Sequence, residues 1–414
     1  MPQKLSRRDV LMSGLGAASL LATGVVGRAL AAEPADALRV PDRSKTAPSL
    51  PVAIQRCISY EPQLVRQTID NAFNLIGGIQ KLVSNKTVTI KINVTGGPDT
   101  LGGLPGYRTY QSHPSVLAAV CGALCDAGAK RIVIVESQYS VKTPEEVLAA
   151  GGWDVKLIQS AGGNKLSFQD TRNRGKWPGY SRLNVPWGGF IYPAFLLNQA
   201  YEKTDVFVSL AKLKDHASAG VTMAVKNLFG IAPTSLYGNE GANENSLTNR
   251  MDVLHDGTRP VPAGVPGEVA QHLPAGWRHR VPRITADLLG ARPVDLCIID
   301  GIETNRGGEG PWCPHTQPLK PNLLLVGRNA VCSDAVGAAV MGYDPQAGHG
   351  QFPFPGDNHL LLLAQAGVGT IDPKRIEVLG LSIEKALFPF NPKRIPLDAP
   401  ATYNLRHNPF AAHV

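Results

Sequence analysis

The run Val206–Leu210 limits the folds open to this chain more than any other stretch. Its sequence is Val-Phe-Val-Ser-Leu, largely apolar and rich in β-branched residues. A run of this length without polar alternation is typical of a strand buried on both faces, as in a parallel sheet that helices cover. Predicted strands and helices alternate on either side of it, which indicates βαβ units. We therefore predict an α/β fold with a mostly parallel sheet and helices on both faces, built as one domain or as two intimately packed α/β lobes.

The predicted elements follow from hydrophobic periodicity and from start and stop signals. Residues 151–200 are less regular and predict short strands or an excursion at the sheet edge. The small residues 333–341 predict a helix with Ser333 as its cap. The other predicted strands are 52–57, 87–92, 131–135, 294–299, 322–326 and 376–379, and the other predicted helices are 62–76, 114–126, a helix from Thr143, one ending at Gly230 and Pro233, 283–289 and 358–366.

Five segments are predicted along the chain. Residues 1–31 have the features of a signal peptide, and 32–51 form a flexible lead-in. Residues 52–233 form an N-terminal α/β lobe, 234–281 an irregular insertion or lid, and 282–414 a C-terminal α/β segment and tail. The insertion is long, polar and without periodicity, which is typical of a lid or a partner surface.

The N-terminus has the sequence features of an export signal. Arg7 and Arg8 precede an uncharged run, 11–27, and the small residues 29–31 fit a cleavage site. This order predicts a twin-arginine signal rather than a membrane span, with a retained anchor as the alternative. We expect the twin-arginine translocase as a partner during export, a periplasmic or extracytoplasmic location, and no permanent membrane span. Many proteins exported by this route carry a cofactor inserted in the cytoplasm.

Charge and cysteine usage exclude several classes of protein. The formal net charge of +8 falls by three when residues 1–31 are removed, and no basic tract occurs. Nucleic acid is therefore not expected as a partner, whereas a small anionic ligand suits the mildly positive chain. The six cysteines contain no C-x-x-C, so no iron–sulfur cluster or zinc knuckle is indicated. Free thiols and disulfides both remain open.

Cations gather directly after the strand 206–210. Lys212, Lys214 and His216 follow it, and Thr222, Lys226 and Asn227 lie on the predicted helix beyond. In open α/β sheets ligands bind at the carboxyl ends of strands, and a helix N-terminus favours an anion. We expect a ligand site here, with a basic surface loop as the alternative.

Other predicted strands also end in polar residues. Lys91 and Asn93 end one strand, and Glu136 and Asp300 end two more. In a parallel sheet these ends share one edge, so the side chains are expected to converge, and His113 at a helix start is expected to join them. Each one alone would be read as a loop residue or a cap.

A glycine-rich acidic loop follows Asp300. With Glu303 and Glu309, that carboxylate could hold a divalent cation through oxygen ligands, or the three could be solvated in a turn. The spacing matches no metal motif, so the metal ligands stay unknown. The glycines form neither a dinucleotide fingerprint nor a P-loop, which leaves nucleotide binding unsupported.

An ordered set of motifs resembles domain-of-unknown-function family 362. The resemblance covers most of the chain beyond the signal peptide. Some members of that family carry ferredoxin-type cysteine motifs, which this chain lacks. The motifs are Lys91-Ile92-Asn93, His113-Pro114, Lys212-Leu213-Lys214-Asp215-His216, Thr222, Lys226-Asn227-Leu228-Phe229-Gly230, Asp300-Gly301, Gly310-Pro311 and Ser333-Asp334-Ala335.

The segment 204–231 is also faintly similar to the N-terminal domain of nickel-pincer lactate racemases. His216 and Lys226 have the spacing of a histidine and a lysine that flank the cofactor there, the lysine attaching it covalently. A catalytic histidine expected after the strand 132–136 is replaced by Tyr139 or its neighbours. The similarity implies a metal or a covalently attached cofactor at Lys226, and an isomerase-like, racemase-like or redox reaction.

These observations predict an exported enzyme that acts on a small carboxylate or phosphate. His216 is expected as the acid and base, Lys226 as a nucleophile or attachment point, and Lys214 as a third catalytic residue. A non-catalytic periplasmic anion-binding protein and a partner of an exported redox complex are the alternatives. The expected ligand-binding residues are Lys91, Asn93, His113, Lys212, Thr222, Asn227, Asp300 and Glu309.

Overall fold

The computed structural model describes residues 40–97, 99–173, 179–269, 275–395 and 397. The predicted signal peptide, the lead-in up to residue 39 and the tail from residue 398 lie outside the described residues. Within the lead-in, Ser44–Thr46 form a 3₁₀ turn, and the amide of Arg43 donates to the carbonyl of Gln365. This end of the chain is therefore tied to the C-terminal segment.

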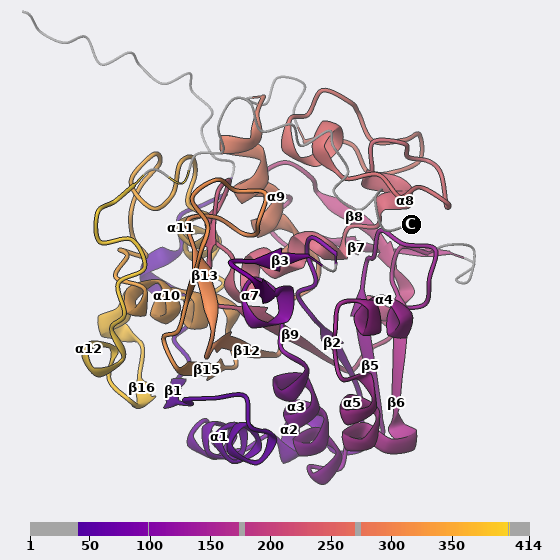
Figure 1. The fold of residues 1–414 in the computed structure, drawn as a ribbon. Coiled ribbons are helices and arrows are strands. Elements are labelled where there is room, and N and C mark those ends of the chain that lie inside the picture. The colour runs from indigo at the N-terminus through magenta and orange to yellow at the C-terminus, as the bar shows by residue number, and fades with distance from the viewer. Residues whose placement is uncertain (1–39, 98, 174–178, 270–274, 396, 398–414) are drawn as a thin grey trace, which may run out of the picture. The chain divides into compact units, whose positions relative to one another are not determined.

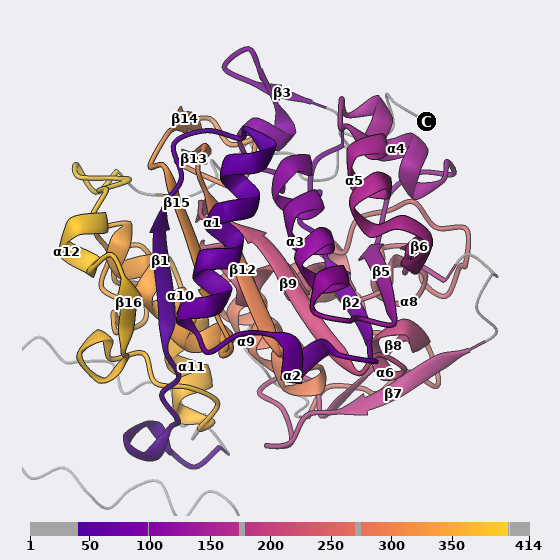
Figure 2. The ribbon, with the colours of Figure 1, turned by 90° about the horizontal axis from the view of Figure 1, so that it is seen from below.

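One eight-stranded sheet organises the described chain, in the order β16-β1-β15-β12-β9-β2-β5-β6. Figure 2 shows it crossing the molecule, with β16 and β6 at the two edges. Its strands are β1 (Val52–Arg56), β2 (Thr87–Lys91), β5 (Arg131–Glu136), β6 (Leu166–Asp170), β9 (Val206–Lys212), β12 (Leu296–Gly301), β15 (Leu323–Gly327) and β16 (Val378–Gly380).

Only β15 runs against its neighbours within this sheet. It pairs antiparallel with β1 and β12, whereas β2, β5, β6, β9 and β12 form an unbroken parallel run and β16 pairs parallel with β1. The predicted α/β class with a mostly parallel sheet is confirmed. Strands from both sides of the insertion 234–281 join in this single sheet, since β12 lies directly beside β9.

Helices cover both faces of the sheet (Figures 1 and 2). On one face lie α1 (Pro62–Leu75), α3 (Pro114–Asp126) and α5 (Val155–Gly162). On the other lie α7 (Met223–Lys226), α9 (Trp277–Ala291), α10 (Ala330–Val340) and α11 (His359–Gln365). Each face buries its own apolar core, so the sheet is sandwiched between two packed layers.

Short elements complete the described fold. Several lie in loops above the carboxyl ends of the strands. They are α2 (Gln80–Val83), α4 (Pro144–Ala150), α6 (Gln199–Glu202), α8 (Thr234–Tyr237) and α12 (Ile383–Ala386), with the two-stranded pairs β3 (Thr100–Leu101) and β4 (Leu104–Pro105), β7 (Tyr180–Asn184) and β8 (Ala194–Asn198), β10 (Asp215–His216) and β11 (Gly220–Val221), and β13 (Thr304–Arg306) and β14 (Gln317–Leu319).

Two predicted helix starts are wrong. Asn329, not Ser333, caps α10, because its side-chain oxygen accepts from the amides of Val331 and Cys332. Helix α9 begins at Trp277, well before the predicted residue 283, and carries Pro282 inside its second turn. Proline usually marks a helix boundary, which is why the sequence placed the start too late. No helix in the described ranges has the length and apolarity that crossing a membrane requires.

Candidate functional site

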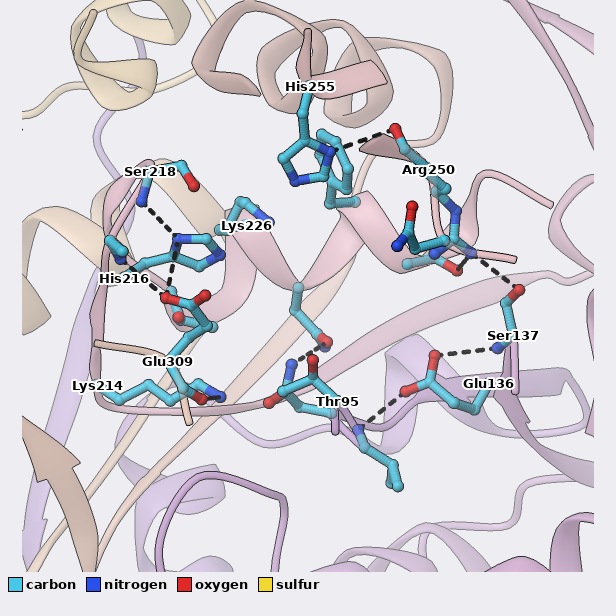
Figure 3. Close-up of a pocket in the computed structure, with 18 of the residues that line it drawn as sticks. Thr95, Glu136, Ser137, Lys214, His216, Ser218, Lys226, Arg250, His255 and Glu309 are labelled. Atoms are coloured by element: carbon cyan, nitrogen blue, oxygen red, sulfur yellow. Dashed lines mark hydrogen bonds and ion pairs between the residues drawn. The ribbon is translucent and has the colours of Figure 1, made fainter. Parts of the chain in front are cut away.

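A pocket of about 320 Å³ opens at the carboxyl ends of β2, β5 and β9, on the face that carries α7. Figure 3 shows its side chains arriving from several elements. The insertion 234–281 supplies part of the wall. The lining residues are Lys91, Asn93, Val94, Thr95, Glu136, Ser137, Tyr139, Lys214, His216, Ala217, Ser218, Thr222, Lys226, Asn227, Phe229, Gly230, Asn249, Arg250, Met251, His255, Glu309 and Trp312.

The pocket brings together most of the residues singled out in the sequence. His113, Lys212 and Asp300 are not among its lining residues. The expected convergence at one sheet edge therefore holds for eight of the eleven predicted site residues. These eight are Lys91, Asn93, Lys214, His216, Thr222, Lys226, Asn227 and Glu309.

Lys226 ends α7 and presents its amine to this pocket. Its Nζ lies 4.2 Å from the centroid of the Phe229 ring and makes no hydrogen bond or ion pair to any described residue. Burial, and then the nearby charges of Arg250 and Lys91, lower the pKa of Lys226 to about 7 against an opposing effect of Glu309. A large fraction of this amine is therefore unprotonated at neutral pH.

Lys214 lies at the other side of Glu309. Its Nζ donates to the carbonyl oxygens of Tyr110 and Glu309, at 2.5 and 3.0 Å. Burial lowers the pKa of Lys214 to about 7, although the Glu309 carboxylate opposes this. Two lysines of the pocket thus titrate near neutrality, because burial disfavours their charged forms.

Glu309 is the negative charge between them. Its Oε2 accepts from the amide of Ala217 at 2.9 Å, and its Oε1 accepts from the indole of Trp312 at 3.0 Å. Burial alone would raise the pKa of Glu309, but these N–H donors oppose that effect and help to hold the pKa below its ordinary value. The carboxylate is fixed and ionised, so it orients the loop that carries His216.

His216 is held as the neutral imidazole. Its Nδ1 accepts from the amide of Ser218 at 3.1 Å, so in the neutral ring the proton sits on Nε2. Burial, followed by the charge of Lys226, moves the pKa of His216 well below its ordinary value. The ring therefore offers an N–H donor, and Figure 3 shows His216 beside Lys226.

Lys91 lines the pocket at the end of β2, and the carboxylate of Glu136 balances its charge. Its Nζ lies 2.6 Å from Glu136 Oε1. Burial lowers the pKa of Lys91, while Glu136 opposes this. Asn227 bridges the strands by accepting from Asn93 Nδ2 at 3.0 Å and donating to Ser209 Oγ at 3.0 Å. Asn93 Oδ1 is buried without a hydrogen-bond partner among the described residues, so it is an acceptor open to a ligand donor.

Four lining residues from the insertion were missed, Asn249, Arg250, Met251 and His255, and Arg250 and His255 are the two basic ones among them. Arg250 donates to Ala232 O at 2.6 Å, Tyr139 Oη at 2.7 Å and Ser137 Oγ at 2.9 Å, with no carboxylate in ion-pair range among the described residues. His255 places Nδ1 3.3 Å from the carbonyl of Arg250, and burial lowers its pKa to about 3. Both lie in an aperiodic segment, and no local sequence signal marked them.

The three outlying residues form a second cluster across the sheet. Lys212 Nζ lies 2.8 Å from Asp300 Oδ2 and 2.9 Å from Tyr60 Oη. His113 caps α3 through Nδ1 and stacks on the Tyr60 ring at 3.4 Å. The alternation of side chains along each strand separates the two clusters. In β9, Val208 and Leu210 face the core that packs against α1 and α3, and Lys212 lies on the same face of the sheet. In β2, Lys91 lies on the opposite face.

The expected anion site at the helix N-terminus is wrong. Helix α7 has only four residues, and the amides of Ala224 and Val225 both donate to the Asp334 carboxylate at 2.8 Å. A side chain of the protein thus occupies the position that the sequence left open for a ligand. Anion attraction in the pocket must come from side-chain cations.

The acidic loop does not gather into a metal site. Asp300 pairs with Lys212, and Glu303 accepts from Arg108 Nε and Nη2 at 2.6 and 2.8 Å. Glu309, as described, binds N–H donors. In the part of the chain that the structure describes, the pocket holds no group of three histidine, cysteine or carboxylate ligands within 4.8 Å. A cofactor held here would rely on Lys226 for attachment rather than on a preformed ligand set. All six cysteines are free thiols.

Comparisons with known proteins place the chain in a family. A thylakoid-associated protein of Synechocystis sp. is 23% identical over 303 residues, covering 71% of this chain and 75% of that protein. A crystal structure of a Thermotoga maritima protein aligns with a TM-score of 0.30 and 10% identity over 61% of this chain and 52% of that one. Residues 88–339 match the family described as domain of unknown function (DUF362). The chain belongs to this family.

Proposed function

We propose that the protein is an exported enzyme that acts on a small anionic substrate carrying a carbonyl group, with Lys226 as its nucleophile. The observation that carries the proposal is the buried amine of Lys226, which faces a pocket, has no carboxylate partner within the described ranges and has its pKa lowered to about 7. A lysine desolvated in this way is a nucleophile for carbonyl carbon.

The covalent step is imine formation. The unprotonated Nζ of Lys226 adds to the carbonyl carbon, and the two protons of the attacking nitrogen leave with the carbonyl oxygen as water. Proton transfer is assigned to the two histidines. His216 carries its proton on Nε2, whereas the contact of His255 Nδ1 with a carbonyl leaves its Nε2 as an acceptor. One ring can donate a proton and the other can accept one.

Substrate charge follows from the cations of the pocket. Arg250 supplies a guanidinium group to the pocket, and Lys214 is partly protonated at neutral pH. Glu309 cancels one of these charges and Glu136 cancels that of Lys91. A small carboxylate or phosphate would balance the positive charge that remains. Asn93 Oδ1 would accept a hydrogen bond from a donor group of the ligand. The twin-arginine features of residues 1–31 support export to the periplasm.

Trapping tests the nucleophile. Glyoxylate, a small oxoacid, is added to the full chain at pH 7 with cyanoborohydride, and peptide mass spectrometry follows modification of Lys226 and of the exposed Lys130. We expect Lys226 to be modified at least tenfold faster, since its amine is less protonated and lies in an anion-attracting pocket. The Lys226→Arg variant should lose the fast-forming adduct at position 226, and the Lys130→Arg variant should keep it.

The same samples separate the alternatives. Intact mass and metal content of the natively purified protein show whether it already carries a bound group, and peptide mass spectrometry shows whether that group is attached to Lys226. Equal rates at the two lysines would rule out Lys226 as a nucleophile. Saturable glyoxylate binding without any adduct would instead identify an anion-binding protein.

A further inference from the structure

A second cluster of ligand side chains lies outside the pocket. Within the described ranges, His279, His349 and Asp357 are the one group of three or more such residues whose ligand atoms all lie within 4.8 Å of one another. His279 lies in the first turn of α9, and the other two lie in the loop that leads from α10 to α11. Nothing in the proposed reaction uses them.

The backbone holds this loop against the helix. The amide of Asp357 donates to the carbonyl of Arg278 at 2.9 Å, and Gly350 N donates to Gly356 O at 2.9 Å. A Cβ at Gly356 would lie 2.0 Å from the Arg278 carbonyl oxygen, so only glycine permits this approach. The loop and the first turn of α9 are therefore fixed in a defined relation, which places the three side chains together.

The donor geometry fits a small transition-metal ion. His349 Nδ1 lies 2.7 Å from Asp357 Oδ1, and His279 Nδ1 lies 3.5 Å from Asp357 Oδ2. Tetrahedral zinc with bonds of about 2.0–2.2 Å separates its ligands by roughly 3.3–3.5 Å. The His349 side chain is 47% exposed, so it can open the shorter separation without disturbing the core.

His279 supplies the second observation. Its Nδ1 is buried and makes no hydrogen bond to any described residue, although it points toward the Asp357 carboxylate. A buried ring nitrogen without a hydrogen bond is costly unless something binds it. The two imidazole rings stack 5.0 Å apart at 21°, and the Nδ1 atoms of His279 and His349 lie 3.5 and 2.7 Å from oxygens of the Asp357 carboxylate.

Arg283 limits how strongly a cation binds here. Its Nε donates to Asp357 Oδ2 at 2.8 Å, which orients the carboxylate and leaves Oδ1 as the metal ligand. The guanidinium charge also repels a second cation, so the affinity is lower than that of a site with an unpaired carboxylate.

We propose that His279 Nδ1, His349 Nδ1 and Asp357 Oδ1 bind one divalent transition-metal ion of the zinc class, with water completing the coordination. Two imidazoles and one carboxylate are ligands that zinc takes in proteins. The ion ties α9 to the loop before α11. Helix α9 packs against the segments Asn227–Ile231 and Met251–His255, which supply Phe229 and His255 to the pocket. The bound ion would thus brace the wall of the pocket.

Zinc titration of the untagged full chain tests this site after chelator treatment. We expect one equivalent to bind, and cobalt in place of zinc to give the intense visible bands of a four-coordinate ion. His349→Ala should weaken zinc binding by at least about tenfold, because it removes a ligand. Removing only a residue that supports a ligand already costs about tenfold in metal affinity. His315→Ala is the matched control, because His315 is exposed and lies outside the cluster.

A second variant keeps the result interpretable. Asp357→Asn should also weaken binding, with circular dichroism verifying that the chain is still folded once the contact to Arg283 is altered. His349→Ala removes a largely exposed side chain, so its fold is expected to be intact. Zinc binding that is undetectable in the wild-type chain, or equal in His349→Ala and His315→Ala, would show that the three side chains form a hydrogen-bonded cluster only.

Discussion

Two buried lysines at the same edge of the sheet, Lys212 on one face and Lys226 on the other, differ in whether their charge is matched. On the α1–α3 face, Lys212 is fully buried and neutralised by Asp300 at 2.8 Å, with Tyr60 bonded to both. On the α7–α9 face, Lys226 is buried beside an aromatic ring with no such partner among the described residues. A closed network stabilises the fold, whereas an unmatched amine facing a pocket costs stability and is retained for another reason.

Removing each lysine should separate these roles most strongly. Lys212→Met leaves the Asp300 carboxylate buried without its cation and is expected to lower the free energy of unfolding by about 3–5 kcal/mol. Lys226→Met removes an unmatched cation and fills the space with an apolar chain, so its free energy of unfolding should be unchanged or higher. Urea unfolding at pH 7 measures both.

A double variant sharpens the same comparison. Lys212→Met combined with Asp300→Leu removes both charges of the pair, which is often close to neutral, so it should recover most of the loss. If Lys226→Met destabilises the protein as much as Lys212→Met does, the distinction between the matched and the unmatched lysine is wrong.

The strands β5, β9 and β12, which help to position both clusters, could be predicted because their sequences are largely apolar. β9 was predicted from Val206 to Leu210 and extends to Lys212. α5 was not predicted, since its eight residues are followed directly by Gly163 and the surrounding segment lacks periodicity. Local patterns are strongest where burial is continuous.

The face that each lysine occupies could not be predicted from local pattern. A strand buried on both sides hides its alternation, so nothing in the sequence 206–212 shows that Lys212 points away from Lys226. Asp334 is distant in the chain, and only the folded packing places it on the amides that begin α7. Arg250 and His255 come from an irregular segment, and again only the folded packing places them in the pocket.

The pH dependence of stability offers a smaller, graded test. The pKa of Lys226 is about 7 in the folded protein and near its ordinary value of 10.5 when unfolded. Between these values the unfolded chain binds more protons, so the free energy of unfolding rises with pH by up to about 1.4 kcal/mol per unit for this group. The cost of burying the charge is present in full below pH 7.

The difference between two proteins isolates this contribution. Asp334, whose pKa burial raises to about 8, opposes the trend in the wild type and is present in Lys226→Met as well. Urea unfolding at pH 7.5, 8.5 and 9.5 should show the wild type gaining stability relative to Lys226→Met, while the exposed-site control Lys130→Met follows the wild type. Parallel curves for wild type and Lys226→Met would mean that this amine is ordinarily protonated.

The smallest expected effect concerns anion binding. It tests whether the positive charge of the pocket attracts an anionic ligand. Sulfate keeps its charge between pH 6 and 9, so any change in its effect comes from the protein. At pH 6 Lys214 and Lys226 are largely protonated, and sulfate at roughly five times its Kd should stabilise the wild type by about 1 kcal/mol through binding. At pH 9 both amines are neutral and this gain should vanish.

Sulfate also stabilises proteins in general by exclusion from their surface, and Lys226→Met measures that background. Thermal unfolding of both proteins at the two pH values gives the comparison. A sulfate gain in the wild type that matches the variant at pH 6 would show that the unmatched lysine does not attract an anion.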